Sequence, residues 1–178
     1  MNRNYALLLV PVAMLLAGCA SVPTDDIAVA AQADSKANFG GYKSYTWLGS
    51  AAIVNDPYGQ WEIPQFDADA EIKHLIDREL RKRGMSQSSP LVNPDMIVAF
   101  AAGIDMEALE LKVDPESKID MLVNVPQGGL LVVLVDGRSG FVIWAGAATA
   151  EIQPSPTAKT VKARLDYAVT ELFRKLPK

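Results

Sequence analysis

The chain has 178 residues, with 17 Lys and Arg against 21 Asp and Glu, a formal net charge of −4, one His and one Cys. An acidic chain without a concentrated basic stretch is a poor nucleic-acid binder, because that binding depends on neutralising phosphates. One cysteine permits no internal disulfide, so the folded domain must be held together by packing alone. With a single His, a zinc site would lack its usual ligands.

Residues 1–18 predict a secretory signal peptide. Arg3 gives a basic start, and residues 6–17 are apolar apart from Pro11. A bilayer-spanning helix needs about 20 apolar residues, so this run is too short to be a permanent anchor. It ends at Leu16-Ala17-Gly18-Cys19, which resembles the lipobox of bacterial lipoproteins.

The lipobox resemblance implies cleavage between Gly18 and Cys19 and lipid attachment to Cys19. A thiolate is a strong nucleophile that can accept a diacylglyceryl group as a stable thioether. Each buried methylene contributes about 0.8 kcal/mol, so this group and an N-acyl chain would anchor the protein to a membrane. No Asp follows the cysteine, which by the same resemblance favours the periplasmic face of the outer membrane. Loss of Arg3 with the signal peptide would leave a formal charge of −5.

Residues 20–38 are small and polar without a sustained period, so residues 19–38 are predicted to be the lipidated Cys and a flexible tether. Residues 39–178 are then a single domain. Its first strand is predicted over residues 42–47, with Tyr45 and Trp47 on one face. Trp47 is expected to be a core residue.

A long turn-rich loop is predicted over residues 50–66, and it carries Tyr58, Trp61 and Phe66. These aromatic side chains have two interpretations. Either they fold back over an open end of the core, or they form an interaction surface, where aromatic residues are enriched.

Helical spacing of apolar residues predicts helices over residues 67–83 and 157–176. The apolar run 95–103 is typical of a central strand with both faces covered. Residues 109–113 and 119–125 predict a hairpin, and residues 129–136 and 141–152 predict another. Together these elements predict an α+β fold, a two-layer sandwich. Its mainly antiparallel or mixed sheet has four or more strands, and two amphipathic helices pack on one face.

Three patterns resemble functional motifs, and each is better explained structurally. His74 lies away from the middle of its helix's apolar stripe and is expected at an exposed or edge position. Asp67-Ala-Asp69-Ala-Glu71 resembles the start of a calcium loop, but Ile72 stands where that loop needs Gly and Arg78 where it needs Glu. These carboxylates are therefore expected to start a helix.

The third pattern, residues 137–141, resembles a serine-hydrolase elbow around Ser139 but has Phe141 in place of the last Gly. The predicted setting is a hairpin, whereas that motif needs a strand-to-helix turn. No phosphate-binding or dinucleotide fingerprint is present. We therefore expect no catalytic residue, no metal and no cofactor beyond the lipid on Cys19. An enzyme would require carboxylates that converge in a cleft.

Four segments together resemble the DUF4136 family of bacterial lipoproteins: residues 39–47, Pro94-Asp95, residues 129–136 and residues 142–146. The family pattern usually has Trp followed by Arg and Gly, whereas this chain has Trp144-Ala145-Gly146. The resemblance implies the fold and an envelope location but no activity. We expect a non-catalytic, lipid-anchored periplasmic domain that docks on another envelope protein. The alternative is a carrier or sensor that binds a lipid or other apolar small molecule.

Overall fold

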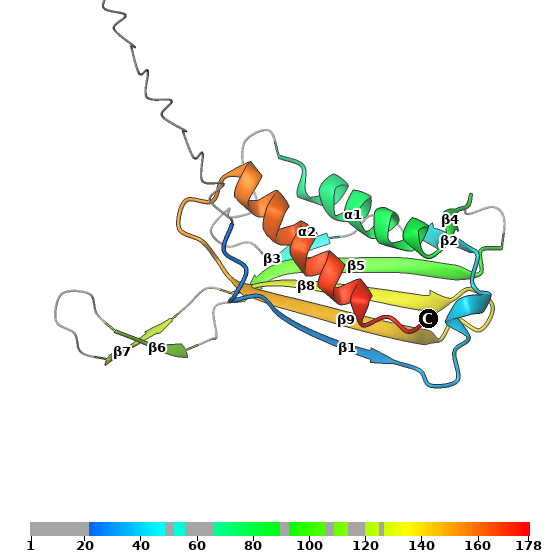
Figure 1. Ribbon diagram of the computed structural model, residues 1–178, viewed down its shortest axis with the longest axis horizontal. Helices are drawn as coiled ribbons and strands as arrows, with labels where there is room; N and C mark the ends of the chain where they lie inside the picture. Colours follow the sequence, from blue (N-terminus) through cyan, green and yellow to red (C-terminus); the bar gives the residue numbers. More distant parts are fainter. Residues whose placement is uncertain are drawn as a thin grey trace, which may run out of the picture.

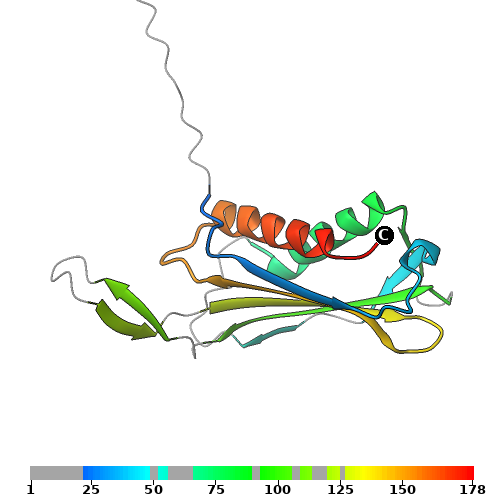
Figure 2. The ribbon, with the colours of Figure 1, turned by 60° about the horizontal axis from the view of Figure 1, so that its bottom comes forward.

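The computed structural model describes residues 22–48, 52–55, 66–89, 93–105, 109–113, 120–124 and 127–178. Two α-helices lie side by side over one face of a mixed β-sheet, as Figures 1 and 2 show from two directions. The predicted α+β two-layer sandwich is thus confirmed. Gly18 and Cys19, like Tyr58 and Trp61, lie outside the described residues.

The main sheet has the order β1-β9-β8-β5-β2-β4, and β3 pairs with β5 beyond the end of β2. Neighbours from β1 to β5 are antiparallel, whereas β2 and β3 run parallel to β5, so the sheet is mixed. The strands are β1 (Ala28–Ala33), β2 (Ser44–Trp47), β3 (Ala52–Asn55), β4 (Ser86–Gln87), β5 (Met96–Asp105), β8 (Gln127–Asp136) and β9 (Val142–Glu151).

Strand β1 corrects the predicted tether. Residues 28–33 pair antiparallel with β9 along their whole length, from Ala28 opposite Thr149 to Ala33 opposite Trp144. The prediction failed because this edge strand is made mostly of alanine and has no alternation of large apolar and polar side chains. Backbone hydrogen bonds to β9 define it, and a sequence pattern does not show these bonds. The folded domain therefore begins well before residue 39.

Helices α1 (Ala68–Lys82) and α2 (Ala158–Arg174) begin and end close to the predicted positions. The Asp67 side chain caps α1 by accepting a hydrogen bond from the Ala70 backbone N–H at 3.0 Å. Thr157 caps α2 in the same way, through the Thr160 N–H at 3.2 Å. The acidic run at 67–71 is thus a helix start, as expected.

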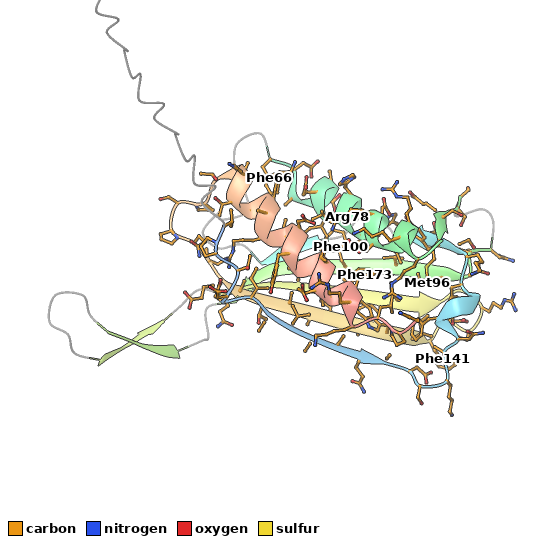
Figure 3. All side chains as sticks on the ribbon, viewed as in Figure 1. Phe66, Arg78, Met96, Phe100, Phe141 and Phe173 are labelled. Carbon is orange, nitrogen blue, oxygen red and sulfur yellow. The ribbon has the colours of Figure 1, made fainter. Side chains whose placement is uncertain are left out.

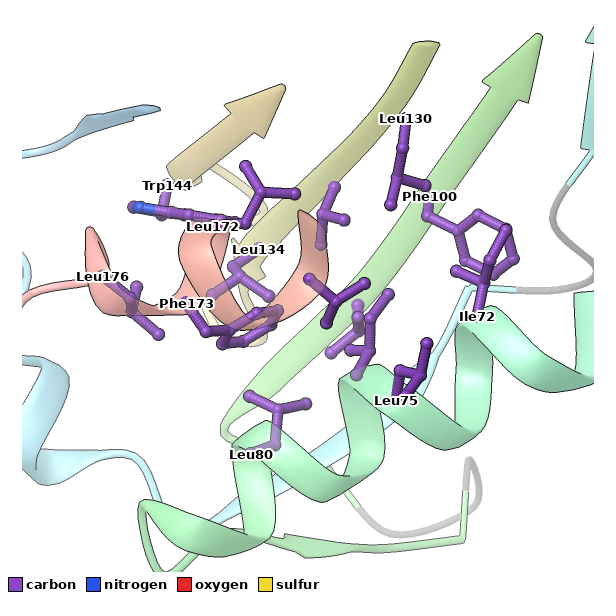
Figure 4. Packing of buried hydrophobic residues seen from close by; sticks show 14 of the residues in the cluster. Ile72, Leu75, Leu80, Phe100, Leu130, Leu134, Trp144, Leu172, Phe173 and Leu176 are labelled. Carbon is purple, nitrogen blue, oxygen red and sulfur yellow. The ribbon is translucent and has the colours of Figure 1, made fainter. Parts of the chain in front are cut away.

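The core lies between the two helices and the inner face of the sheet (Figure 4). Trp144 is 1% exposed, and its ring centroid lies 5.6 Å from that of Phe173 on α2. A Cβ on Gly146 would approach the Trp144 ring to 2.3 Å, so a glycine is required beneath this indole. Trp47 is half-buried and packs against the same core. The buried residues drawn in the close-up include Ile72, Leu75, Leu80, Phe100, Leu130, Leu134, Leu172 and Leu176.

A two-stranded ribbon extends beyond one end of the main sheet (Figures 1 and 2). It consists of β6 (Leu109–Val113) and β7 (Asp120–Asn124), which pair antiparallel with each other. This confirms the predicted hairpin, whose turn lies outside the described residues. Among the described elements, neither ribbon strand pairs with the main sheet.

Candidate docking face

The outer sheet face is the face of the main sheet that points away from α1 and α2. Side chains alternate between the two faces of a strand, and Met96, Val98 and Phe100 of β5 are buried on the inner one. The strand register places the residues between them, with their partners, on the outer face. The central part of that face consists of Ile97, Ala99, Ala101 and Gly103 on β5; Gly129, Leu131, Val133 and Val135 on β8; Val142, Ala145, Ala147 and Thr149 on β9; and Ala28, Ala30 and Gln32 on β1. At the end nearest the ribbon, the same register adds Asp105, Gln127 and Glu151.

The outer sheet face has a ridge along its middle strand. Leu131, Val133 and Val135 form this β8 ridge. Alanines on the two neighbouring strands flank its first two members, so small side chains form a lower row on each side. The flanking pairs are Ala101 and Ala147 beside Leu131, and Ala99 and Ala145 beside Val133.

The central part of the outer sheet face carries no charged residue, and its charged positions on these strands, Asp105 and Glu151, lie together at the end nearest the ribbon. Leu131 is 43% exposed and Val142 is 55% exposed, so large apolar side chains on it reach solvent. The helix layer is different, because ion pairs such as Arg78–Asp166 and Lys162–Glu71 link its two helices. An uncharged apolar patch on one face is the feature expected of a protein-interaction surface.

The predicted central strand β5 is therefore covered on one face only by described elements. The inner residues are covered by the helices, but Ile97, Ala99 and Ala101 on the outer face are only half-buried. In the sequence, this surface is therefore indicated mainly by β5, whose side chains are apolar on both faces although the helices cover only one of them. From the sequence alone, the same apolar run predicts burial of both faces within the domain.

The segments that resemble the family meet at the opposite end of the sheet from the ribbon, and their polar contacts are structural. Asp95 accepts hydrogen bonds from the Lys43 and Ser44 backbone N–H groups and from the Ser44 hydroxyl, at 2.9, 2.9 and 3.0 Å. Tyr42 donates its phenol proton to Asp136 at 2.8 Å. These bonds connect the start of β2 to the start of β5 and to the last residue of β8.

Asp136 also organises the hairpin that was compared with a hydrolase elbow. Its carboxylate accepts bonds from the Ser139 backbone N–H and hydroxyl at 2.7 and 2.8 Å, and these bonds lower the pKa of Asp136 to about 2. Ser139 thus serves a β-hairpin turn, as the sequence predicted. His74 is exposed on α1, also as predicted.

A second polar cluster, which the sequence analysis missed, fixes the start of the chain. Arg164 on α2, 8% exposed, pairs with both carboxylate oxygens of Asp26, at 2.9 and 2.5 Å. The same guanidinium donates to the Pro23 and Glu151 carbonyls, and Asp26 accepts from the Glu151 N–H at 2.9 Å. We call Asp26 and Arg164 the N-terminal clamp. The available signal was a charged residue, Arg164, within the apolar stripe of α2.

An apolar pocket lies beside this clamp, between α2 and the ends of β8 and β9. Its volume is about 90 Å³, and Leu130, Ala148, Val161 and Leu165 contribute to its walls. Pockets for small molecules usually measure about 300–1,000 Å³. Arg164, the charged donor in the lining, is already paired with Asp26. The pocket is thus too small to enclose a lipid.

Phe66 is the one aromatic residue of the 50–66 loop that the structure describes. It lies just before α1, half-buried, and packs against the core (Figure 3). This position agrees with the interpretation that the aromatic residues cover an end of the core. Within the described ranges there is no group of three or more His, Cys, Asp or Glu that could hold a metal ion. No described helix is both long and apolar enough to cross a bilayer.

Fold and surface together define an α+β sandwich in which helices cover one sheet face and the central part of the other face is apolar. The chain belongs to the DUF4136 family, a domain family of unknown function, whose model matches residues 29–178. The match begins within β1, in agreement with a domain that starts before residue 39. No curated protein matches the chain.

Two solved structures illustrate the fold. A DUF4136 family protein from Bacteroides thetaiotaomicron is 12% identical, with a TM-score of 0.57, and the match covers 85% of this chain and 96% of that one. A PDZ domain protein from Parabacteroides distasonis is 14% identical, with a TM-score of 0.52 and 86% of this chain covered. This chain spans only 37% of the length of the latter protein. At such low identity the likeness extends to the fold alone.

Proposed function

We propose that this protein is a lipid-anchored, non-catalytic domain of the bacterial cell envelope that docks on a protein partner through its outer sheet face. Cys19 provides the anchor, and the periplasmic face of the outer membrane is the proposed location. The observation that carries the docking role is the apolar central part of the outer sheet face, with Leu131 and Val142 exposed on it. Burial of this central part gains about 25 cal/mol per Å² of apolar surface and brings no charged side chain into the contact.

The second candidate function is binding of an apolar small molecule in the pocket beside α2. Its support is the apolar lining, which includes Leu130 and Val161. Its weakness is volume, because about 90 Å³ holds only a few methylene groups. Docking through the outer sheet face is therefore the better-supported function.

Site-specific photo-crosslinking in living cells tests the docking proposal. A photoreactive amino acid replaces Leu131, which is 43% exposed on the outer sheet face, in the full chain. The matched control carries the same amino acid at Tyr167, which is 39% exposed on α2. The proposal predicts discrete protein adducts from position 131 and none of comparable yield from position 167. Equal yields at the two positions, or no adduct at position 131, would contradict it.

A further inference from the structure

We propose that the free edge of β1 accepts an extended segment of a different protein, which adds to the main sheet as a further strand. This inference rests on the proposed docking function and states how the partner binds, because the added strand would continue the outer sheet face. Two features of the molecule carry it: the hydrogen-bonding groups along this edge and the small side chains beside it.

Strand β1 forms one margin of the main sheet (Figures 1 and 2). Facing residues of an antiparallel pair alternate between hydrogen-bonded and non-hydrogen-bonded pairs. The Asp34 N–H donates to the Ile143 carbonyl at 2.8 Å, so these two residues form a hydrogen-bonded pair. Counted back along the register, the backbone N–H and C=O groups of Val29, Ala31 and Ala33 point away from β9. Each offers one donor and one acceptor to an added strand, and no described element pairs with this edge.

This edge lacks the features by which native proteins prevent pairing with another chain. Protected edge strands are short or bulged, or they carry charged residues or proline. At the other end of the strand order, β4 has only two residues, whereas β1 has six, without charge, proline or a break in its pairing with β9. The N-terminal clamp holds the segment that leads into β1. An open edge of fixed shape is the surface that β-strand addition uses.

The side chains beside this edge indicate what the added strand carries. On the outer sheet face, Ala30 of β1 lies beside Ala147 of β9, and Ala147 lies beside Leu131 of the β8 ridge. One level closer to the ribbon, Ala28 lies beside Thr149. Small side chains on two strands therefore form a low region between the edge and the ridge. Large apolar side chains at alternate positions of the added strand, on the side of the outer sheet face, would cover this region.

The same features favour a different protein over a second copy of this chain. Four of the six residues of β1 are alanine, so a second β1 would bring mostly methyl groups and leave the low region uncovered. The charged positions of the outer sheet face, Asp105 and Glu151, lie beyond the Ala28 end of β1, because Ala28 pairs with Thr149. An apolar segment opposite residues 28–33 therefore meets no charged residue of β1.

Hydrogen exchange tests strand addition directly. In the full-length chain purified in detergent, the outward N–H groups of Val29, Ala31 and Ala33 should exchange rapidly. In native membranes, where the partner is present, the same groups should exchange at least about tenfold more slowly. The N–H of Ala30, which points towards β9, is the internal reference and should change little. Mass spectrometry with residue-level fragmentation measures the rates, and equal exchange of the outward groups in the two preparations would overturn the inference.

Photo-crosslinking with a backbone variant tests the geometry. A photoreactive amino acid replaces Gln32 on β1, and the matched control carries it at Gln87, an exposed glutamine on β4. We expect adducts from position 32 only. Ala31→Pro removes one outward N–H without removing a bond to β9, so it should lower the yield from position 32 by about tenfold or more. Ala31→Val keeps this N–H and should not. Circular dichroism checks folding, and the exchange experiment decides if the proline variant unfolds.

The outcomes separate this inference from the docking function on which it rests. In the supporting outcome, positions 32 and 131 crosslink to the same protein, and the peptide attached to position 32 has large apolar residues at alternate positions. Adducts from position 131 alone, with rapid exchange at the outward groups in membranes, overturn strand addition and leave docking in place. Adducts from position 32 to a second copy of this chain overturn the proposed occupant. No adduct from either position overturns both proposals.

Discussion

At the scale of single residues, aspartates carry much of the polar organisation. Asp95 and Asp136 fasten one end of the sheet, and Asp26 fastens the start of the chain to α2. The pKa of each carboxyl group is lowered: for Asp95 mainly by the Lys43 N–H, for Asp136 mainly by the Ser139 N–H, and for Asp26 mainly by hydrogen bonds from Arg164. The folded state therefore favours the ionised form of these groups.

The lowered pKa of Asp136 predicts that the protein loses stability in acid. Its pKa is about 2 in the folded protein, below its ordinary value of 3.8. A carboxyl group whose pKa is lower in the folded state than in the unfolded state stabilises the folded protein fully above the unfolded-state pKa. This stabilisation is lost as the pH falls through the folded-state pKa. Asp136→Asn should be less stable than wild type at pH 6. The difference between their free energies of unfolding should become smaller between pH 4 and pH 2. Urea unfolding of both proteins across this pH range measures the difference. A difference that is independent of pH would contradict the lowered pKa of Asp136.

The N-terminal clamp makes a second residue-scale prediction. Asp26→Ala removes the ion-pair partner of Arg164, a guanidinium that is 8% exposed, and should lower the free energy of unfolding by about 2 kcal/mol. The control is Asp25→Ala, which changes an exposed neighbour and should alter stability by less than about 0.5 kcal/mol. Denaturant titration of both variants measures the difference. Equal effects of the two substitutions would show that the clamp contributes no stability.

Local sequence signals predicted several individual residues correctly and missed others. Asp67 was identified as part of a helix start because capping depends on residues three positions apart. The Asp26–Arg164 pair joins residues that are far apart in the chain, and no local pattern brings them together. The same holds for the Tyr42–Asp136 hydrogen bond.

At the scale of elements, periodicity predicted both helices and the long strands of the sheet. Strand β1 was missed because its alanines carry no alternating pattern, although its pairing with β9 is continuous. The apolar run of β5 was recognised, but the sequence could not show that helices cover only one of its faces. The face of β5 that the helices leave uncovered is part of the candidate docking face. The only sequence signal for that face was therefore a strand whose side chains are apolar on both sides.

The ribbon is the element that we expect to be dispensable for folding. Strands β6 and β7 pair with each other, and the last β5–β8 pair joins Asp105 to Gln127. Replacement of residues 106–126 by Asn-Gly would close this pair with a two-residue hairpin turn. The domain should remain folded, and its melting temperature should change by less than about 4 °C. Loss of cooperative thermal unfolding would show that the ribbon contributes to the core.

At the scale of the whole molecule, the clamp brings the folded domain close to its proposed anchor. Arg164 holds Asp26, and six residues lie between Asp26 and Cys19. Such a segment spans at most about 25 Å when fully extended. The sheet and helices would therefore lie near the bilayer.

We propose that Cys19 holds this domain at a membrane, where its outer sheet face meets a partner. The most direct measurement is the intact mass of the denatured chain recovered from the membrane fraction. We expect a polypeptide that begins at Cys19 and carries diacylglyceryl and N-acyl groups. We also expect Cys19→Ser to abolish both cleavage and lipid attachment. An unmodified Cys19 with residues 1–18 still attached would contradict it.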